Sequence, residues 1–418
     1  MLKKIVVENF KSLKNCEIEF NKFNVIIGKN SSGKSNLIEV FKILKKIYID
    51  NDPYPFLEWW GYKNIVWNGE ETLPITIKLI FEINNVETIF ETIFTGTGGK
   101  FEILRERLFV KGYSEIICEN KNIVITNNKK LIEELGKSDV KISLEYCSKF
   151  KKDNNNSVLL KIPVGKYRVI SGHNNTIPYE LVKLESLSNS PKIIMPKLNK
   201  KEHIQYIILN YINSLISFPP HIKSLKEPQR PLKDNNLKES SINLINVVYN
   251  IFLENGGKLP EEIISPLNQL FPDIRIIFQL TDDGRVLMKL IKDNNIELFP
   301  PSISDGFYKV LLLLTIAYLN KPLVFIDEIE NSLYPESLKL VVDCLKNSNS
   351  QIILTTHSPI LVDMTEPKNV CYVLKEYGES NFIKPKNPEE LKDKLNKLGL
   401  TFSEGWLYGD IFNMWNNG

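Results

Sequence analysis

Hydrophobic and polar positions over the first third of the chain predict β-strands. Over residues 75–83 every second position holds Ile, Leu or Phe, and most positions between them are polar, as in a strand with one buried face. Asn84-Asn85 follows and turns the chain back. These features predict an antiparallel β subdomain within residues 1–170. Further apolar runs of strand length lie over 3–10, 16–20 and 23–27. Others, separated by Gly- and Asn-rich breaks, continue to about Ile170.

The pattern changes from residue 171, where Pro-, Lys- and Asn-rich connections separate helical periodicities. Two stretches, 203–216 and 242–253, have the apolar spacing of helices, and Gly256-Gly257 ends the second. They predict an inserted helical subdomain. Strand patterns then return on both sides of Asp283-Gly284, a hairpin turn, and an α/β pattern continues. The expected divisions of the chain are 1–170, 171–272, 273–378, and a C-terminal helix with an aromatic tail over 379–418.

A phosphate-binding loop is predicted between the apolar run 23–27 and a helix whose apolar positions include Leu37, Phe41 and Leu44. The loop fits G-x-x-x-x-G-K-[ST], in which glycines let the backbone approach a polyphosphate and amide N–H groups point inward at a helix N-terminus. Its lysine reaches the β- and γ-phosphates, and its last serine holds Mg²⁺. The residues expected at the nucleotide are Gly28, Lys29, Asn30, Ser31, Ser32, Gly33, Lys34, Ser35 and Asn36.

Two carboxylates end a second buried strand. Residues 323–326 are continuously apolar, as in a strand covered on both faces, and Asp327 and Glu328 follow directly. At the carboxyl end of such a strand they face the ligand crevice. We expect Asp327 to hold Mg²⁺ through water and Glu328 to act as the general base that polarises the attacking water.

Two further elements lie at comparable positions. His357 follows the buried-strand pattern 351–356, where an imidazole can sense the γ-phosphate. Ser304-Asp305-Gly306 precedes the apolar helix pattern 307–319, and its serine with the helix N-terminal amides can bind an anion. The same three residues serve equally well as a helix cap.

The order of these motifs resembles the ABC class of ATPases in its soluble branch, the SMC, RecF and OLD-like proteins. Residues 8–13 resemble the opening strand of that branch, 328–335 its D-loop, and 355–359 its switch region. The resemblance implies an α/β fold, a P-loop NTPase of ABC type with an antiparallel β subdomain and an inserted helical subdomain. It adds Lys11 and Asn331 to the expected nucleotide contacts.

The resemblance also implies how the site works. In this class two ATP molecules lie between two head domains, each touching one subunit's phosphate loop and the other subunit's S-x-G helix. The chain carries one copy of each motif, so a homodimer or higher assembly is expected, with ATP and Mg²⁺ as ligands and Asn331 near the dimer interface. The expected catalytic residues are Lys34, Glu328 and His357.

The chain departs from the class in several features. No Gln precedes Gln205, so Asn64 or Asn68 is a candidate substitute for the usual glutamine loop. Ile303 replaces the usual leucine. No long heptad pattern predicts SMC-type arms. No cluster of acidic residues resembling the Toprim nuclease domain of OLD-family proteins follows His357.

These features lead to a hypothesis of an ATP-hydrolysing sensor or scaffold subunit of an anti-phage defence system, acting with a separate effector such as a nuclease. The alternative is a RecF-like DNA-repair or DNA-clamp ATPase whose basic stretches contact double-stranded DNA. A transporter subunit is disfavoured, and a switch that binds ATP without hydrolysis stays open. The basic stretches are 149–152, 197–201 and 223–233; an aromatic tail that either docks a partner or packs on its own core contains Phe402, Trp406, Tyr408, Phe412 and Trp415.

Composition narrows these alternatives only slightly. A net charge of +3 says little about nucleic acid. The five cysteines have no C-x-x-C spacing, which speaks against a zinc site or a disulfide framework. The longest apolar run, 310–319, is too short to cross a bilayer, and no N-terminal signal is evident. We therefore expect a cytoplasmic protein without a membrane partner.

Overall fold

The computed structural model divides into two compact units. The first comprises Met1–Phe20, Ser35–Asn213 and Leu374–Phe382, and the second comprises Asn21–Lys34, Ser214–Val373 and Ile383–Gly418. The residues that the structure describes are 1–112, 114–119, 122–127, 167–168, 182–183, 204–214, 222–233, 236–238, 240–292 and 295–407.

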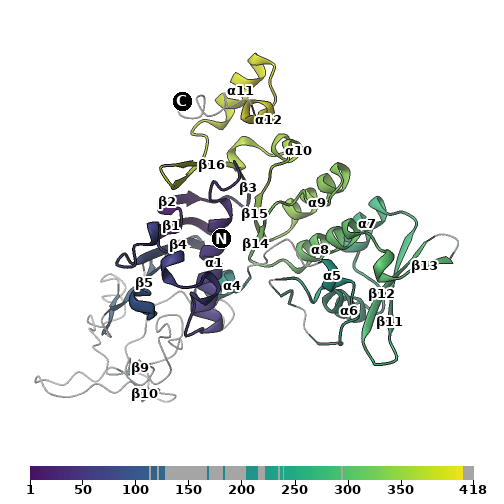
Figure 1. The fold of residues 1–418 in the computed structure, drawn as a ribbon, viewed down its shortest axis with the longest axis horizontal. Helices are drawn as coiled ribbons and strands as arrows, with labels where there is room; N and C mark the ends of the chain where they lie inside the picture. The colour runs from purple at the N-terminus through teal and green to yellow at the C-terminus, as the bar shows by residue number, and fades with distance from the viewer. Residues whose placement is uncertain are drawn as a thin grey trace, which may run out of the picture. The chain divides into compact units, whose positions relative to one another are not determined.

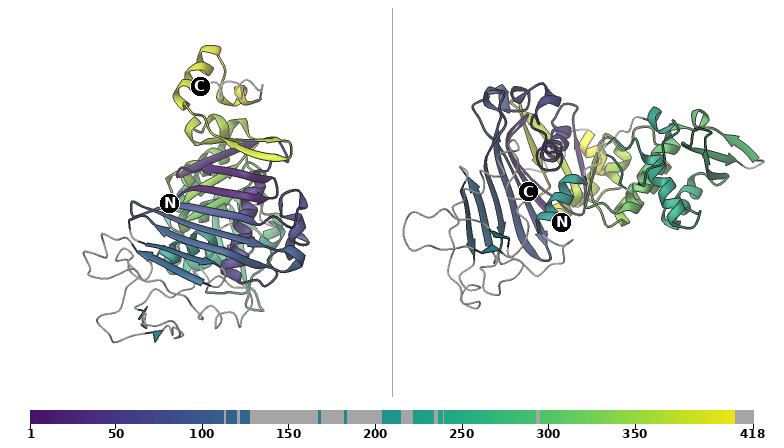
Figure 2. Two further views of the ribbon diagram at one scale, coloured as in Figure 1. Left: turned by 90° about the vertical axis from the view of Figure 1, so that its left-hand side faces the viewer. Right: turned by 90° about the horizontal axis from the view of Figure 1, so that it is seen from below.

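A seven-stranded antiparallel sheet forms the centre of the first unit, in the order β2-β1-β4-β5-β6-β7-β8. Its strands lie side by side in the left view of Figure 2. The alternation over 75–83 puts every second side chain into the core, as predicted. Asn84 and Asn85 both have positive φ angles, 49° and 62°, which suits a tight hairpin turn. The strands are β1 (Leu2–Phe10), β2 (Leu13–Glu19), β4 (Ile75–Ile83), β5 (Val86–Thr95), β6 (Glu102–Val110), β7 (Ser114–Glu119) and β8 (Asn122–Asn127).

Helices and short turns complete the first unit. The predicted helix after the phosphate loop is confirmed as α1 (Lys34–Lys45), which buries Leu37, Phe41 and Leu44. It continues into a π-helical turn, Lys46–Asp50. Helix α4 (Ile204–Asn213) lies within the stretch predicted to be helical. Short 3₁₀ turns occur at Leu57–Trp59, Tyr62–Asn64, Trp67–Gly69 and Thr97–Gly99, and two-residue strands pair at β9 (Tyr167–Arg168) and β10 (Val182–Lys183).

Parallel strands form the sheet of the second unit. Strand β3 (Phe23–Gly28) pairs with β15 (Gln351–Thr355) on one side and β16 (Val370–Glu376) on the other, and β14 (Leu323–Ile326) pairs with β15. With β17 (Glu379–Ile383) the order is β14-β15-β3-β16-β17. Since β14, β15, β3 and β16 are parallel, the residues that follow β3, β14 and β15 leave the sheet at the same end of the strands.

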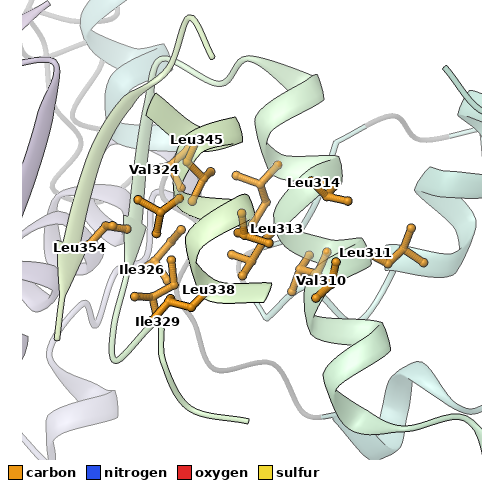
Figure 3. Packing of buried hydrophobic residues seen from close by; sticks show 14 of the residues in the cluster. Val310, Leu311, Leu313, Leu314, Val324, Ile326, Ile329, Leu338, Leu345 and Leu354 are labelled. Atoms are coloured by element: carbon orange, nitrogen blue, oxygen red, sulfur yellow. The ribbon is translucent and has the colours of Figure 1, made fainter. Parts of the chain in front are cut away.

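The core of the second unit packs helices against that sheet. Figure 3 shows side chains of α8 (Asp305–Leu319) and α9 (Pro335–Asn347) meeting those of β14 and β15. Helix α8 buries ten consecutive residues, 307–316, so it is enclosed on all sides rather than on one face. The labelled residues are Val310, Leu311, Leu313, Leu314, Val324, Ile326, Ile329, Leu338, Leu345 and Leu354.

The remaining elements of the second unit can be followed by label in Figure 1. The hairpin predicted at Asp283-Gly284 is confirmed, with the two strands in antiparallel register. Helix α7 was not predicted, although Pro260 and two glutamates mark its start, because Pro266 interrupts the helical pattern. These elements are α5 (Ile222–Leu225), α6 (Leu244–Glu254), α7 (Glu261–Leu270), β11 (Ile274–Leu280), β12 (Val286–Lys292), β13 (Ile296–Leu298), α10 (Pro359–Asp363), α11 (Pro388–Leu398) and α12 (Phe402–Leu407).

The aromatic tail is described only in part. Phe402 and Trp406, both in α12, pack against the core of the second unit. For these two residues the structure therefore agrees with packing on the protein's own core, one of the two roles considered for the tail. Tyr408, Phe412 and Trp415 lie outside the described residues. Within the described ranges, no helix has the length and apolar character needed to span a bilayer. The domain boundaries expected from the sequence stay a prediction.

Candidate nucleotide site

The loop between β3 and α1 has the compact backbone that phosphate binding requires. A Cβ at Gly28 would lie 2.6 Å from the Val373 carbonyl oxygen and 2.9 Å from Ser32 Oγ, so only glycine fits there. Ser31 and Gly33 have φ angles of 61° and 105°. Left-handed backbone within such a loop turns successive N–H groups toward one concave side, which forms an anion-binding nest.

Lys34, the first residue of α1, lies buried in this loop with 6% of its surface exposed. Its Nζ donates to the carbonyl oxygens of Gly28, at 2.8 Å, and Lys29, at 3.1 Å. Burial lowers the pKa of Lys34, while the charges of three carboxylates raise it. The ammonium is therefore electrostatically coupled to the acids after β14. Such coupling is expected of a lysine that binds a polyphosphate next to the acids that hold its metal ion. These carboxylates are Asp327, Glu328 and Glu330.

Thr355, at the end of β15, contacts both acidic residues predicted after β14, one through its carboxylate and the other through its backbone. Thr355 Oγ1 donates to Asp327 Oδ1 and accepts from the Glu328 backbone N–H, at 2.9 Å. Glu328 has a φ of 47°, in the left-handed region that non-glycine residues rarely adopt and that is often found at functional sites. Its Oε2 accepts from Asn331 Nδ2 at 2.6 Å. The strand ends thus fix the position of both acids.

Glu330 is a site residue that the sequence analysis missed. Its Oε2 accepts from Thr356 Oγ1 at 2.8 Å, and its Oε1 accepts from the His357 backbone N–H at 2.6 Å. It therefore fastens the segment after β15 to the turn after β14. The sequence signal for Glu330 was its position, two residues beyond the Asp-Glu pair. That position alone does not identify a site residue, because an acid there can have several roles.

His357 presents a polar atom without a partner. Its Nε2 is buried and makes no hydrogen bond within the part of the chain that the structure describes. A buried polar atom of this kind calls for a ligand or water. Together with a buried ammonium and a carboxylate held by a neighbouring threonine, it suits the oxygens of a nucleoside triphosphate and a hard divalent cation.

The S-x-G segment begins α8 and acts there as a helix cap. Ser304 Oγ accepts from the Phe307 backbone N–H at 3.3 Å, and Asp305 pairs with Lys226 Nζ at 2.8 Å. A Cβ at Gly306 would lie 3.2 Å from the Ser332 carbonyl oxygen, so the first turn of α8 lies close against the D-loop. The expected anion-binding role of this segment stays a prediction beside the cap that is observed.

Three expected nucleotide contacts belong to the first unit. The Lys11 ammonium pairs with Glu39 and lies 5.9 Å from the ring centroid of Trp59. Asn36 Nδ2 donates to Ser12 Oγ at 2.6 Å, and Ser35 is an exposed residue in the first turn of α1. Lys34, Asp327, Glu328, Asn331 and His357 all belong to the second unit, where Lys29 and Asn30 are exposed.

The remaining predictions are described only in part. The basic stretches 149–152 and 197–201 lie outside the described residues, and in the third stretch Lys226 is paired with Asp305. Asn64 Nδ2 donates to the Trp60 carbonyl oxygen at 3.3 Å, and Asn68 has a φ of 52° in a 3₁₀ turn. Their role as substitutes for the glutamine loop stays a prediction.

Comparison with known proteins places this site in a wider context. The chain is 24% identical over 389 residues to a Helicobacter pylori protein named "ATP/GTP phosphatase", with 88% of each chain covered. An SMC head bound to the C-winged helix domain of ScpA matches it with a TM-score of 0.52 and 14% identity, over 93% of this chain and 99% of that one. A Pyrococcus furiosus SMC head domain matches with a TM-score of 0.47 and 16% identity, over 95% and 99%.

The likeness to the SMC head with the higher TM-score confirms the expected fold, an α/β P-loop NTPase of ABC type. A family model described as "AAA domain, putative AbiEii toxin, Type IV TA system" matches residues 23–159 and 166–363. The matched ranges include the phosphate loop, the Asp327-Glu328 pair and His357. Because the match covers most of the chain, the chain belongs to this family of AAA-domain ATPases.

Proposed function

We propose that this ATPase binds MgATP between two copies of the chain and uses hydrolysis to control a separate effector protein. The supporting observation is the group formed by Lys34, Asp327 and Glu328, in which a buried cation is coupled to two acids. Thr355 bonds to the carboxylate of the first acid and to the backbone N–H of the second. The chain carries one phosphate loop, and the S-x-G segment that precedes the Asp-Glu strand is the one at the start of α8. In the ABC class that it resembles, these two elements act on the same nucleotide from different subunits.

The residues of the site divide the work of phosphoryl transfer. Lys34 would leave its carbonyl partners and bind the β- and γ-phosphates. Ser35 and Asp327 would hold Mg²⁺, which when bound supplies positive charge against the phosphate oxygens. The unpartnered Nε2 of His357 would donate to an oxygen of the γ-phosphate. These groups stabilise charge and position the substrate.

Glu328 would supply the base. A water molecule attacks the γ-phosphorus, the bond to the β-phosphate oxygen breaks, and ADP and phosphate leave. Glu328 accepts the proton that the water gives up. One oxygen of its carboxylate accepts a hydrogen bond from Asn331 in the present structure, so this contact has to change before both oxygens can serve the water.

The family description and the motif resemblance support the proposed biological role. The family description names a putative toxin of a type IV toxin–antitoxin system, and the order of motifs resembles that of the OLD-like proteins. We therefore propose a role as the sensor or scaffold subunit of an anti-phage defence system, with a separately encoded effector such as a nuclease. ATP binding that closes two copies of the chain can switch such a partner, because binding energy favours the closed state.

Light scattering tests the ATP-dependent closure. The Glu328→Gln variant with ATP and Mg²⁺ should have twice the mass that it has with ADP and Mg²⁺, because nucleotide that is not hydrolysed keeps the two copies together. The ADP sample serves as the matched control, since it differs only in the γ-phosphate. An equal mass in both samples would contradict the proposed sandwich and leave an ATPase that acts without closure.

A further inference from the structure

Helix α8 contains a buried charge that the proposed mechanism does not use. Lys309 lies within the ten-residue buried run 307–316 and is the charged residue in it, with 2% of its surface exposed. An ammonium group is costly to bury unless hydrogen bonds and opposite charges compensate it. Residues retained at such a cost are often found where a protein needs a specific contact. The contacts of Lys309 therefore indicate what it does.

Lys309 joins α8 to the D-loop and through it to the proposed base. Its Nζ donates to the Asn331 carbonyl oxygen, and Asn331 Nδ2 in turn donates to Glu328 Oε2 at 2.6 Å. A second contact runs beside this one, because the first turn of α8 lies against Ser332 at Gly306. Helix α8, the D-loop and the general base thus form one connected group within the second unit.

We propose that Lys309 is a positioning residue that couples movement of α8 to the carboxylate of Glu328 through Asn331. The proposal rests on the proposed function, in which the N-terminus of α8 meets a nucleotide. As that helix end moves toward phosphate, Lys309 draws the Asn331 backbone with it. The Asn331 amide then leaves Glu328 Oε2, and the carboxylate turns to the attacking water. Lys309 itself does not touch the substrate.

The protonation of Lys309 gives this coupling a pH dependence. Burial lowers the pKa of Lys309 to about 8, while the facing carboxylates of Glu330 and Glu328 raise it. The same two acids also act on the Lys34 ammonium. Above about pH 8 Lys309 loses its positive charge, and its bond to the Asn331 carbonyl weakens. Turnover of the unaltered protein should therefore fall as the pH rises through about 8.

The test compares Lys309→Met with Thr315→Val. Thr315 is a buried polar residue of the same helix whose hydroxyl donates to a carbonyl of that helix, at Leu311, so its loss controls for a change in the packing of α8. We expect Lys309→Met to lower kcat by about 10- to 100-fold, the effect of a misplaced catalytic group, without changing ATP affinity. Its pH profile should lack the fall near pH 8, whereas Thr315→Val keeps it.

A double-mutant cycle separates coupling from simple packing. Asn331→Ala removes the amide that holds Glu328 Oε2, so it should leave kcat near that of the unaltered protein. Lys309→Met should then have little effect in the Asn331→Ala background, because the amide that Lys309 displaces is absent. Three results would each overturn the proposal: an equal loss of kcat from Lys309→Met with and without Asn331→Ala, an unchanged kcat in Lys309→Met, or a lowered kcat in Lys309→Met with the fall near pH 8 intact. Failure of the proposed function would give a different result, because Glu328→Gln would then have the same turnover as the unaltered protein.

Discussion

Glu328→Gln is expected to lower kcat for ATP hydrolysis by about 10²- to 10⁴-fold, the usual contribution of a general base. The amide keeps the shape of the carboxylate and can still bond to Asn331, but it cannot accept the proton of the attacking water. ATP affinity should change little, since Lys34 and the phosphate loop are untouched. Phosphate release at saturating ATP measures the loss, and equilibrium binding of a fluorescent ATP analogue measures the affinity.

Glu336→Gln is the matched control, because Glu336 is an exposed carboxylate in the first turn of α9. It should leave kcat unchanged. Equal turnover in Glu328→Gln and the unaltered protein would remove Glu328 from the role of base. The left-handed backbone at Glu328 is retained in the glutamine variant, so both proteins should unfold at about the same temperature.

Lys34→Met should weaken ATP binding by roughly 10- to 100-fold, the value of a hydrogen bond to a charged group. It should also lower turnover by about 10²- to 10³-fold, as removal of a preorganised donor usually does. Methionine fills most of the volume of the buried side chain but carries no charge. The loss arises because the phosphates would meet the carboxylates of Asp327 and Glu328 without the cation that is coupled to both.

Isothermal titration with ATP and Mg²⁺ measures the affinity, and Lys22→Met is the control. Lys22 is an exposed lysine just before β3, at the other end of the strand that leads into the loop. Unchanged ATP affinity in Lys34→Met would show that the loop amides hold the nucleotide alone. A loss of similar size in Lys22→Met would point to the net charge of the chain instead.

The phosphate loop and its flanking elements could be predicted from the sequence because local chemistry determines them. Gly28 is required by the close approach of the Val373 carbonyl, and α1 follows with the apolar spacing of a helix packed on one face. The Asp327-Glu328 pair could be placed for the same reason, as a buried strand has to end where polar residues begin. Residue types and their spacing along the chain were therefore sufficient to predict both the phosphate loop and the acidic pair.

Lys309 and Glu330 could not be predicted because their roles depend on contacts between distant segments. A single lysine in the apolar run 307–319 is compatible with an exposed stripe, and only the enclosure of α8 shows that this lysine is buried. Glu330 bonds to residues just after β15, a strand that lies next to β14 in the sheet but is distant from it in the sequence. The roles of these two residues therefore become clear only from burial and from the order of strands in the sheet, and not from residue spacing.

Mixing two inactive variants tests most directly whether one site is built from two copies of the chain. Lys34→Met damages the phosphate loop, and Ser304→Arg blocks the N-terminus of α8. In a sandwich dimer a mixed pair contains one site with both elements intact, so an equal mixture should regain about a quarter of full turnover. As the control, Lys34→Met mixed with Glu328→Gln should stay inactive, since each copy then carries a damaged phosphate loop or base.

A site built from two copies predicts recovery of turnover in the first mixture and none in the second. Turnover in the first mixture that equals the mean of the two separate variants would contradict it, because the S-x-G helix would then serve the nucleotide of its own chain or none.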